Sequence, residues 1–281
     1  MIIRKKEIEN LSMAIRKLID GQEIDIRCNQ EGAWPILKND IHILAGQNKE
    51  QIQFLQQERD ILKHTLADIS HQIKTPLTSM SIMLDLVEGA PSEKQVELLK
   101  NMRASLDQTQ WLVEALLKIA KLESGSISFS KKEHPVESLV QTAILPLAIQ
   151  LEIKEQTISY QLKEDLTIFC DARWTSEALG NIIKNASEHS PKDSQIVIVT
   201  GENPIAAWIK VQDCGDGLTN EQIAKLFRRF EASNSSAGYG IGLPLAKSIM
   251  KSQKGDIEVD GGGNGQGATF TLKFYKMVEN D

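Results

Sequence analysis

Apolar residues recur through the first half of the chain at the spacing of long amphipathic helices. From about 50 to 88 they alternate at intervals of three and four positions, the heptad repeat of a helix packed along one seam. Arg59 and Pro76 interrupt this seam. It resumes over 99–120, after the turn-forming stretch "EGAPSEK" at 88–94. The pattern predicts two long helices that form an antiparallel hairpin over 49–125.

A single hairpin of this kind buries its two apolar stripes poorly. Two hairpins can cover each other's stripes in a four-helix bundle, so we expect a homodimer. The repeat also places His71 between Ile69 and Ile73, at the most outward position of the heptad. We therefore expect His71 on the bundle surface. From the seam alone, an ordinary surface histidine is the simpler interpretation.

Residues 1–48 show a weaker pattern. Two short amphipathic stretches, at 8–18 and 36–44, are separated by a polar loop. They predict a helical linker with a solvated face.

The composition of the chain changes at about residue 126. Short runs with β-like patterns alternate with helical patterns at 136–154, 173–188, 220–229 and 242–252. The β-like runs are "SISFS", "TISYQL", "LTIFCD", "QIVIVTG", "AAWIKVQD", "DIEVDG" and "ATFTLKFY". This order predicts an α/β sandwich over 126–281, a mixed sheet with helices packed on one face.

Charge and cysteine content exclude several classes of protein. The formal net charge of -6 over 281 residues argues against a nucleic-acid-binding protein, which needs a basic surface. The three cysteines are far apart and fit no metal-ligand spacing. No apolar run is expected to reach the roughly 18 residues of a membrane span. We expect a cytoplasmic chain whose parent protein is anchored in the membrane by a segment absent from this sequence.

Two clusters in the second half carry candidate chemistry. Asn181 and Asn185 are four residues apart, so they share one helix face, and amide oxygens suit a Mg²⁺ ion that bridges phosphates. Two unrelated surface asparagines would look the same. In "VQDCGDGL", Asp213 follows a β-like run and could accept a hydrogen bond from an adenine amine. Gly215 and Gly217 would keep the approach to Asp213 open.

Two glycine-rich stretches follow. Gly238, Gly240 and Gly242 run directly into a helical segment, an arrangement that can bind phosphate through free backbone N–H groups. The small polar residues of "EASNSSAG" before it have the composition of a mobile flap. In "GQGATF", Gly265 and Gly267 open the last β-like run, and the Thr269 hydroxyl can reach a base. Each cluster is weak alone, but their order along the chain is specific.

With that order, residues 60–275 resemble the two-component sensor histidine kinases. The stretch "SHQIKTPL" resembles the H box of the family, "NIIKNA" the N box and "LFRRF" the F box. Three glycine boxes are matched by "DCGDG", "GYGIGL" and "GQGATF". The resemblance implies a dimerisation and phosphotransfer hairpin, joined to a Bergerat-type ATP-binding domain. It also implies a HAMP-like linker for 1–48.

The resemblance implies roles for individual residues. His71 would accept the γ-phosphoryl group of ATP and pass it to an aspartate of a response regulator, Thr75 would orient water for dephosphorylation of that regulator, and Pro76 would bend the helix. Asn181 and Asn185 would hold Mg²⁺. The residues implied to contact ATP are Asn181, Lys184, Asn185, Asp213, Gly215, Gly217, Phe227, Arg229, Phe230, Gly238, Gly240, Gly242, Leu243 and Thr269. Among them, Phe227, Arg229 and Phe230 would anchor a lid.

The chain departs from the family at two positions. Gln72 follows His71 where the family usually has Glu or Asp, and its amide can orient the imidazole without removing a proton. Glu188 stands where the family often has a phosphate-facing lysine, and Lys184 lies one turn earlier. These departures leave an alternative open: a degenerate kinase that acts as an ATP-gated interaction module, or mainly as a regulator phosphatase.

A third reading is an ATPase of the chaperone or repair type. In such enzymes a glutamate one turn before the metal-binding Asn activates water. Here that position is Asn181, an amide that cannot be a general base. Asn181 and the H box therefore favour a kinase over a hydrolase.

Overall fold

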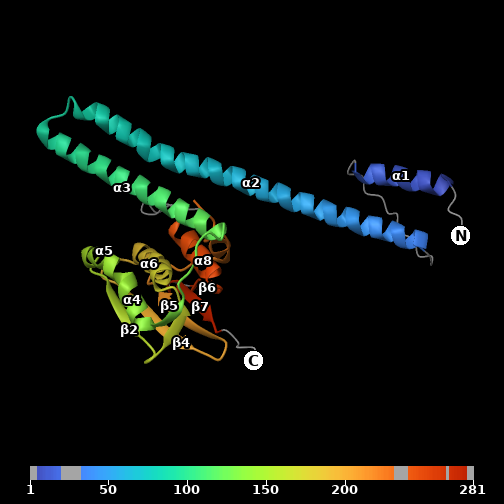
Figure 1. Cartoon of the computed structure of the whole chain (residues 1–281). Coiled ribbons are helices and arrows are strands. Elements are labelled where there is room, and N and C mark those ends of the chain that lie inside the picture. Colours follow the sequence, from blue (N-terminus) through green and yellow to red (C-terminus); the bar gives the residue numbers. More distant parts are fainter. Residues whose placement is uncertain (1–4, 20–32, 231–239, 264–265, 277–281) are drawn as a thin grey trace. The chain divides into compact units, whose positions relative to one another are not determined.

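The computed structural model of the chain describes residues 5–19, 33–230, 240–263 and 266–276 (Figure 1). Its contacts divide the chain into two units, Met1–Asp68 and Ile69–Asp281. The first unit contains helix α1 (Lys5–Ile19) and the beginning of helix α2 (Ala33–Val87). The two predicted amphipathic stretches are thus helical, and α2 continues unbroken past residue 48.

The second unit begins with the hairpin that the heptad pattern predicts. Helix α2 ends at Val87, and helix α3 (Ser92–Glu123) begins after a short turn. On the part of α2 that lies in this unit, the seam residues Ile69, Ile73, Pro76, Met80, Met83 and Val87 are less exposed than most of their neighbours. The predicted hairpin is confirmed, and so is the seam from Ile69 onward, whereas the seam positions Ile52, Leu55, Leu62 and Leu66 are exposed.

The prediction of the seam on α3 is only partly correct. Met102, Thr109 and Leu116 are partly buried, but Leu99, Leu106 and Val113 remain 53%, 49% and 39% exposed. A second stripe on α3 is buried instead: Leu112, Ala115, Ile119 and Leu122. It belongs to the same hydrophobic core as the α/β domain, and α3 packs there against helix α8 (Gly242–Ser252). The C-terminal half of α3 therefore carries two stripes, the predicted seam of the hairpin and a second stripe that packs in the core of the α/β domain.

The remaining elements form an α/β sandwich. The strands are β1 (Lys132–Pro135), β2 (Thr157–Gln161), β3 (Thr167–Cys170), β4 (Gln195–Glu202), β5 (Ala206–Gln212), β6 (Gly255–Asp260) and β7 (Thr269–Tyr275). The other helices are α4 (Val136–Ile144), η1 (Leu145–Leu147), α5 (Ala148–Ile153), α6 (Ala172–His189) and α7 (Asn220–Lys225). The main sheet has the order β2-β4-β5-β7-β6, with β2 parallel to β4 and the other pairs antiparallel. It is the mixed sheet that the sequence predicts.

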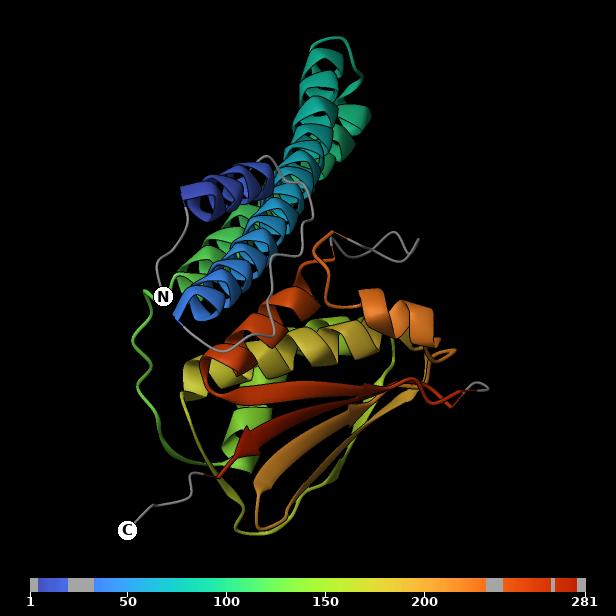
Figure 2. The same ribbon diagram turned by 90° about the vertical axis from the view of Figure 1, so that its right-hand side faces the viewer.

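Helices cover one face of this sheet (Figure 2). Alternate side chains on the central strands are buried beneath them, among them Ile196 and Ile198 on β4, Ile209 and Val211 on β5, and Phe270 and Leu272 on β7. This alternation follows from the two-residue period of a strand. The one-faced α/β sandwich is confirmed.

Two predicted elements near residue 130 are wrong. The stretch "SISFS" at 126–130 forms no strand, because the partner strand β3 is only four residues long and pairs instead with Lys132–Pro135. The predicted helix 136–154 is divided into α4, η1 and α5. Pro146 lies at the start of η1, where it has no N–H for a helical hydrogen bond.

The same region bears on the membrane prediction. The window Val136–Ile153 has a mean hydropathy of 1.3, so the expectation that no apolar stretch of this length exists is wrong by composition. In the structure, Val136, Leu139, Val140 and Ala143 of this window are buried in the domain core. The window therefore forms part of the α/β domain.

A buried polar network joins the segment before β1 to the body of the domain. The Gln253 side chain accepts a hydrogen bond from the Asp171 N–H at 2.7 Å and donates one to Thr175 Oγ1 at 3.1 Å. The backbone carbonyl of Gln253 accepts a hydrogen bond from Lys131 Nζ at 2.6 Å. Asp171 Oδ2 in turn accepts one from the Ser130 N–H at 2.9 Å. Residues 130–131 are thus fastened to the ends of α6 and α8.

Candidate functional site

The candidate phosphoacceptor His71 lies on α2 with an exposed side chain, as the heptad predicts. Its neighbour Gln72 is partly buried and Thr75 is exposed. The Thr75 hydroxyl donates a hydrogen bond to the backbone carbonyl of His71 at 3.0 Å. Pro76 lies inside the helix and has no N–H to donate to the Gln72 carbonyl one turn earlier. The helix therefore lacks one backbone hydrogen bond directly after His71, although it continues to Val87.

Helix α6 carries both asparagines, and Asn181 lies beside the beginning of α8. The Asn181 amide nitrogen donates to the Glu177 carbonyl at 2.9 Å, which leaves the amide oxygen for another partner. A Cβ atom added to Gly242 would lie 3.0 Å from that oxygen. Asn185 follows one turn later and is partly buried. The first residue of α8 thus lies against Asn181, so a helix N-terminus and the Asn181 amide oxygen adjoin one another.

This donor set fits a hard cation that keeps most of its waters. Mg²⁺ prefers oxygen ligands and is commonly held by one or two protein oxygens together with substrate phosphates. Among the described residues, no cluster of three or more His, Cys, Asp or Glu side chains could hold a metal by itself. Asn181 and Asn185 would therefore hold Mg²⁺ only together with a phosphate ligand.

Lys184 projects from the same helix between two partners. Its ammonium lies 3.8 Å from a carboxylate oxygen of Glu188 and 5.1 Å from the centroid of the Trp111 ring on α3. Burial raises the pKa of Glu188 above its ordinary value, while Lys184, His189 and Lys154 act in the opposite direction. The anion found at the family's usual lysine position is thus paired with the lysine one turn earlier.

Asp213 is buried at the end of β5. Its Oδ1 accepts hydrogen bonds from the N–H groups of Gly215 and Ala268, both at 2.9 Å. Among the described residues, these two N–H groups are the hydrogen-bond donors to the Asp213 carboxylate, and both bind Oδ1. Oδ2 is therefore the oxygen left for a ligand donor such as an exocyclic amine. Thr269 follows Ala268 and is partly buried at the start of β7.

Close backbone packing around Asp213 explains two of the glycines. Gly267 has φ +72°, and a Cβ atom there would lie 2.0 Å from the Asp213 carbonyl oxygen. Gly217 has φ +79°, and its Cβ atom would lie 2.5 Å from the Gly261 carbonyl oxygen. Any side chain at either position would force the backbone apart.

The F-box residues follow α7, which ends at Lys225 and is shorter than the predicted helix 220–229. Phe227 and Phe230 are partly buried against the core. Phe230 has φ +64°, and its N–H donates to the Gly240 carbonyl at 3.1 Å. Before Phe230 the chain already forms tighter turns, in which the Leu226 N–H donates to the Ile223 carbonyl and the Arg228 N–H to the Lys225 carbonyl. Arg229 forms an ion pair with Glu123 at the end of α3.

The glycine-rich stretch is described only in part. Gly240 and Gly242 are placed, and Leu243 is buried in the first turn of α8. Gly238, the rest of the predicted flap "EASNSSAG" and Gly265 lie outside the described residues. Within the described residues, the structure brings Asn181 next to Gly242, and Asp213 next to Gly215 and Gly267.

Three residues of α3 that sequence reasoning missed contact the α/β domain. Trp111 lies against Lys184, Lys118 pairs with Glu177, and Glu123 pairs with Arg229. The available signal was the second apolar stripe of α3 at 112, 115, 119 and 122, which also follows the three-and-four spacing. It indicated another packing surface, although no sequence pattern identifies the pairs.

Two family profiles match the chain. Residues 62–125 match the His Kinase A (phospho-acceptor) domain, and residues 170–277 match the histidine kinase-, DNA gyrase B- and HSP90-like ATPase domain. The curated relatives include the heme sensor protein HssS of Staphylococcus saprophyticus, 28% identical over 79% of this chain and 48% of the relative. The sensor histidine kinase WalK of Bacillus subtilis is 28% identical over 83% of this chain and 39% of that protein. The chain thus spans about half or less of the length of these relatives.

Solved structures share the fold. The histidine kinase AdeS of Acinetobacter baumannii has a TM-score of 0.62, with 22% identity over 73% of this chain and 97% of that one. The histidine kinase ThkA in complex with the response regulator TrrA has a TM-score of 0.65, with 17% identity over 83% of this chain and 67% of that one. At these identities the likeness concerns the fold.

Proposed function

Because the chain belongs to the two-component sensor histidine kinases, we propose that it phosphorylates its own His71 with ATP and passes the phosphoryl group to a response regulator. A neutral imidazole nitrogen of His71 attacks the γ-phosphorus, the bond to the β–γ bridging oxygen breaks, and ADP leaves, while the other ring nitrogen releases its proton to solvent. The phosphoryl group then moves to an aspartate carboxylate of the regulator. The observation that carries this proposal is the exposed His71 side chain within the matched phosphoacceptor domain.

Separate groups of residues bind the adenine, the phosphates and the Mg²⁺ ion in the proposed nucleotide site. Asp213 Oδ2 accepts a hydrogen bond from the adenine amine, and the backbone N–H groups at the start of α8, together with Lys184, face the phosphates. Asn181 and Asn185 hold Mg²⁺, which when bound neutralises charge on the phosphates. Asn181 cannot activate water as a general base, so the γ-phosphoryl group awaits the imidazole.

The chain acts as a homodimer. Leu99, Leu106 and Val113 form an exposed apolar line on α3, which supports pairing of two hairpins into a four-helix bundle. In that assembly 49–125 is the dimerisation and phosphotransfer hairpin, 126–281 the ATP-binding domain and 1–48 a HAMP-like linker. We place this portion in the cytoplasm of a membrane-anchored parent. Thr75, one turn after His71, supports a regulator phosphatase activity.

The test is labelling of the purified chain with γ-labelled ATP and Mg²⁺. The wild type is expected to gain an acid-labile, alkali-stable phosphate that His71→Ala loses. His64→Ala is a matched control, since His64 is exposed on the same helix one heptad earlier. Label that persisted in His71→Ala, or that disappeared equally in His64→Ala, would contradict the assignment.

A second candidate function is an ATP-gated interaction module or a mainly phosphatase protein. The observation that favours it is the pair of departures, Gln72 beside His71 and Glu188 at the usual lysine position. Binding of ATP without any label on His71, combined with accelerated loss of phosphate from a phosphorylated regulator, is the outcome expected of this alternative.

A further inference from the structure

Lys247 lies on the second turn of α8, outside every motif that the sequence analysis identified. Its ammonium lies 5.1 Å from the centroid of the Phe227 ring. A cation over an aromatic face is attracted by the electrons of the ring, and the attraction is stronger where water is partly excluded. Phe227 is partly buried against the core, so this ring is such a place.

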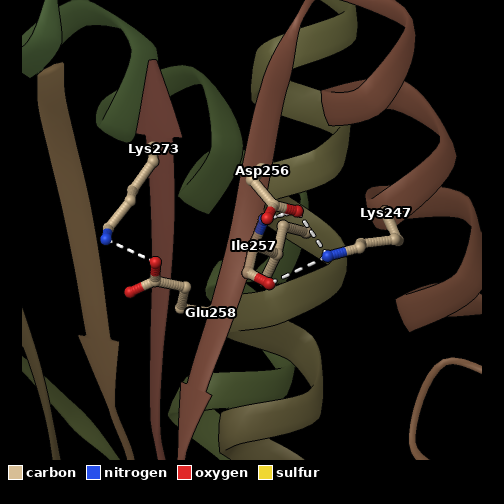
Figure 3. Close-up of polar contacts among 5 residues, drawn as sticks. All are labelled: Lys247, Asp256, Ile257, Glu258 and Lys273. Carbon is tan, nitrogen blue, oxygen red and sulfur yellow. Dashed lines mark hydrogen bonds and ion pairs between the residues drawn. The ribbon is translucent and has the colours of Figure 1, made fainter. Parts of the chain in front are cut away.

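The ammonium is fixed by a second set of contacts on the edge strand β6 (Figure 3). It forms an ion pair with Asp256 and donates to the Ile257 carbonyl at 3.0 Å. The Asp256 carboxylate is itself held by the Ile257 N–H at 2.8 Å. Hydrogen bonds from Lys247 and Ile257 keep the pKa of Asp256 below its ordinary value, although its burial acts to raise it.

These contacts join helix α8, the F-box residue Phe227 and strand β6. Lys247 belongs to the helix that starts at Gly242, whose backbone lies against Asn181. Its ammonium holds the ring of Phe227, and Asp256 holds the ammonium. Lys247 thus adds a side-chain link between the F box and α8, beside the hydrogen bond from the Phe230 N–H to the Gly240 carbonyl.

We propose that Lys247 is a positioning residue of the nucleotide site, which acts on ATP binding by holding Phe227 against α8. The inference rests on the proposed function, because that function assigns ATP to this site. Lys247 itself contacts Phe227, Asp256 and the Ile257 carbonyl, and it has no part in the phosphoryl transfer step.

The same strand offers a matched control. Lys273 on β7 lies opposite Asp256 in the strand register and pairs with Glu258 on β6, and Figure 3 shows no bond from this pair to Lys247. Lys273→Met removes an ammonium and an ion pair from the same sheet edge without removing a cation from an aromatic ring. Any effect of general surface charge or of a lost ion pair should appear equally in this variant.

The experiment measures autophosphorylation kinetics and binding of a fluorescent ATP analogue to the full chain. Lys247→Met is expected to raise KM for ATP and the Kd of the analogue about three- to tenfold, the range that one cation–aromatic contact supports. We expect kcat to stay within about twofold, because a positioning effect on binding leaves the reacting atoms unchanged. Lys273→Met is expected to keep wild-type values. Lys247→Arg should restore affinity to within about twofold, since a guanidinium also stacks on rings and pairs with carboxylates.

A double-mutant cycle separates positioning from a structural role. In a Phe227→Leu background, Lys247→Met is expected to change the Kd less than twofold, because the ring through which it acts is gone. Asp256→Asn, a milder variant that retains the size of the side chain, should raise the Kd in the same direction by a smaller factor.

An unchanged Kd in both Lys247→Met and Asp256→Asn would overturn the inference, as would an equal rise in the Phe227→Leu background. The two proposals fail separately. If the Kd responds as expected but His71 of the wild type gains no label, the inference stands and the kinase assignment falls. If His71 is labelled but Lys247→Met leaves the Kd unchanged, the kinase assignment stands and the inference about Lys247 falls.

Discussion

The ammonium of Lys184 lies between the ring of Trp111, 5.1 Å away, and the carboxylate of Glu188, 3.8 Å away. Trp111 belongs to α3 and Lys184 to α6, so one contact joins the phosphotransfer hairpin to the N box. A lysine that faces phosphates cannot at the same time give its full charge to a ring. The two contacts of Lys184 are therefore in competition with a bound triphosphate.

Replacing Trp111 by Leu should free this lysine. We expect Trp111→Leu to lower the Kd for an ATP analogue about two- to fivefold, the range of one partly exposed cation–aromatic contact. Lys184→Met should raise the Kd, and in that background the Trp111 substitution should have no further effect. Fluorescence titration of the four proteins checks this. Equal affinity of the wild type and Trp111→Leu would show that the contact does not oppose nucleotide binding.

Gln72→Glu should accelerate autophosphorylation. A carboxylate next to His71 can remove the imidazole proton, whereas the amide can only orient the ring. General-base assistance is typically worth about 10²–10⁴-fold, and we expect a smaller gain because the amide already orients the imidazole. Initial rates of His71 labelling at saturating ATP provide the measurement. Unchanged or slower labelling would show that proton removal at this position does not limit the rate.

Gly267→Ala should damage the adenine side of the site more than its backbone conformation alone explains. Gly125→Ala is the matched control: Gly125 has φ +65°, and a Cβ atom there meets nothing within 4 Å, whereas at Gly267 it would lie 2.0 Å from the Asp213 carbonyl oxygen. The control should lose about 1–2 kcal/mol of stability from the left-handed conformation. Gly267→Ala should lose more and also bind ATP weakly. Urea unfolding and nucleotide titration of both variants test this, and equal losses would contradict it.

Glu188→Gln should stabilise the protein at neutral pH but not in acid. Burial raises the pKa of this carboxyl in the folded chain above its ordinary value of 4.5. As pH rises through 4.5, the unfolded chain ionises first, so the wild type loses stability until the folded pKa is passed. The glutamine variant lacks this loss. Its advantage in thermal midpoint should therefore appear above pH 4.5 and vanish below it, and an advantage that did not depend on pH would exclude this cause.

Much of the architecture follows from local patterns. The heptad predicts α2, the turn after Val87 and the exposure of His71, because one buried seam leaves the opposite face in solvent. Period-two alternation predicts the central strands β4, β5 and β7. Motif order likewise indicated Asp213 and Asn181. The structure places Asp213 beside Gly215 of its own motif and beside Gly267, and it places Asn181 beside Gly242, a glycine of a separate motif.

The features that the sequence did not predict depend on contacts between residues that are far apart along the chain. Nothing within "SISFS" shows that β3 is too short to pair with it, and the ion pairs of Lys118 and Glu123 depend on where α3 meets the α/β domain. Lys247 looks like any helix lysine until Phe227 and Asp256 are placed around it. The role of such a side chain comes from its tertiary contacts, and the local periodicity of a single sequence does not reveal those contacts.

The hydrogen bonds of Gln253 determine where the chain can be cut. A fragment that begins at 126 keeps the Ser130 N–H for Asp171 and the Lys131 ammonium for the Gln253 carbonyl. One that begins at 136 loses both donors and also the strand β1 that pairs with β3. A proteolytic site or an inserted reporter domain should therefore unfold the ATP-binding domain when placed between 130 and 136, whereas one placed at 124–126 should leave both these hydrogen bonds and the buried stripe of α3 intact.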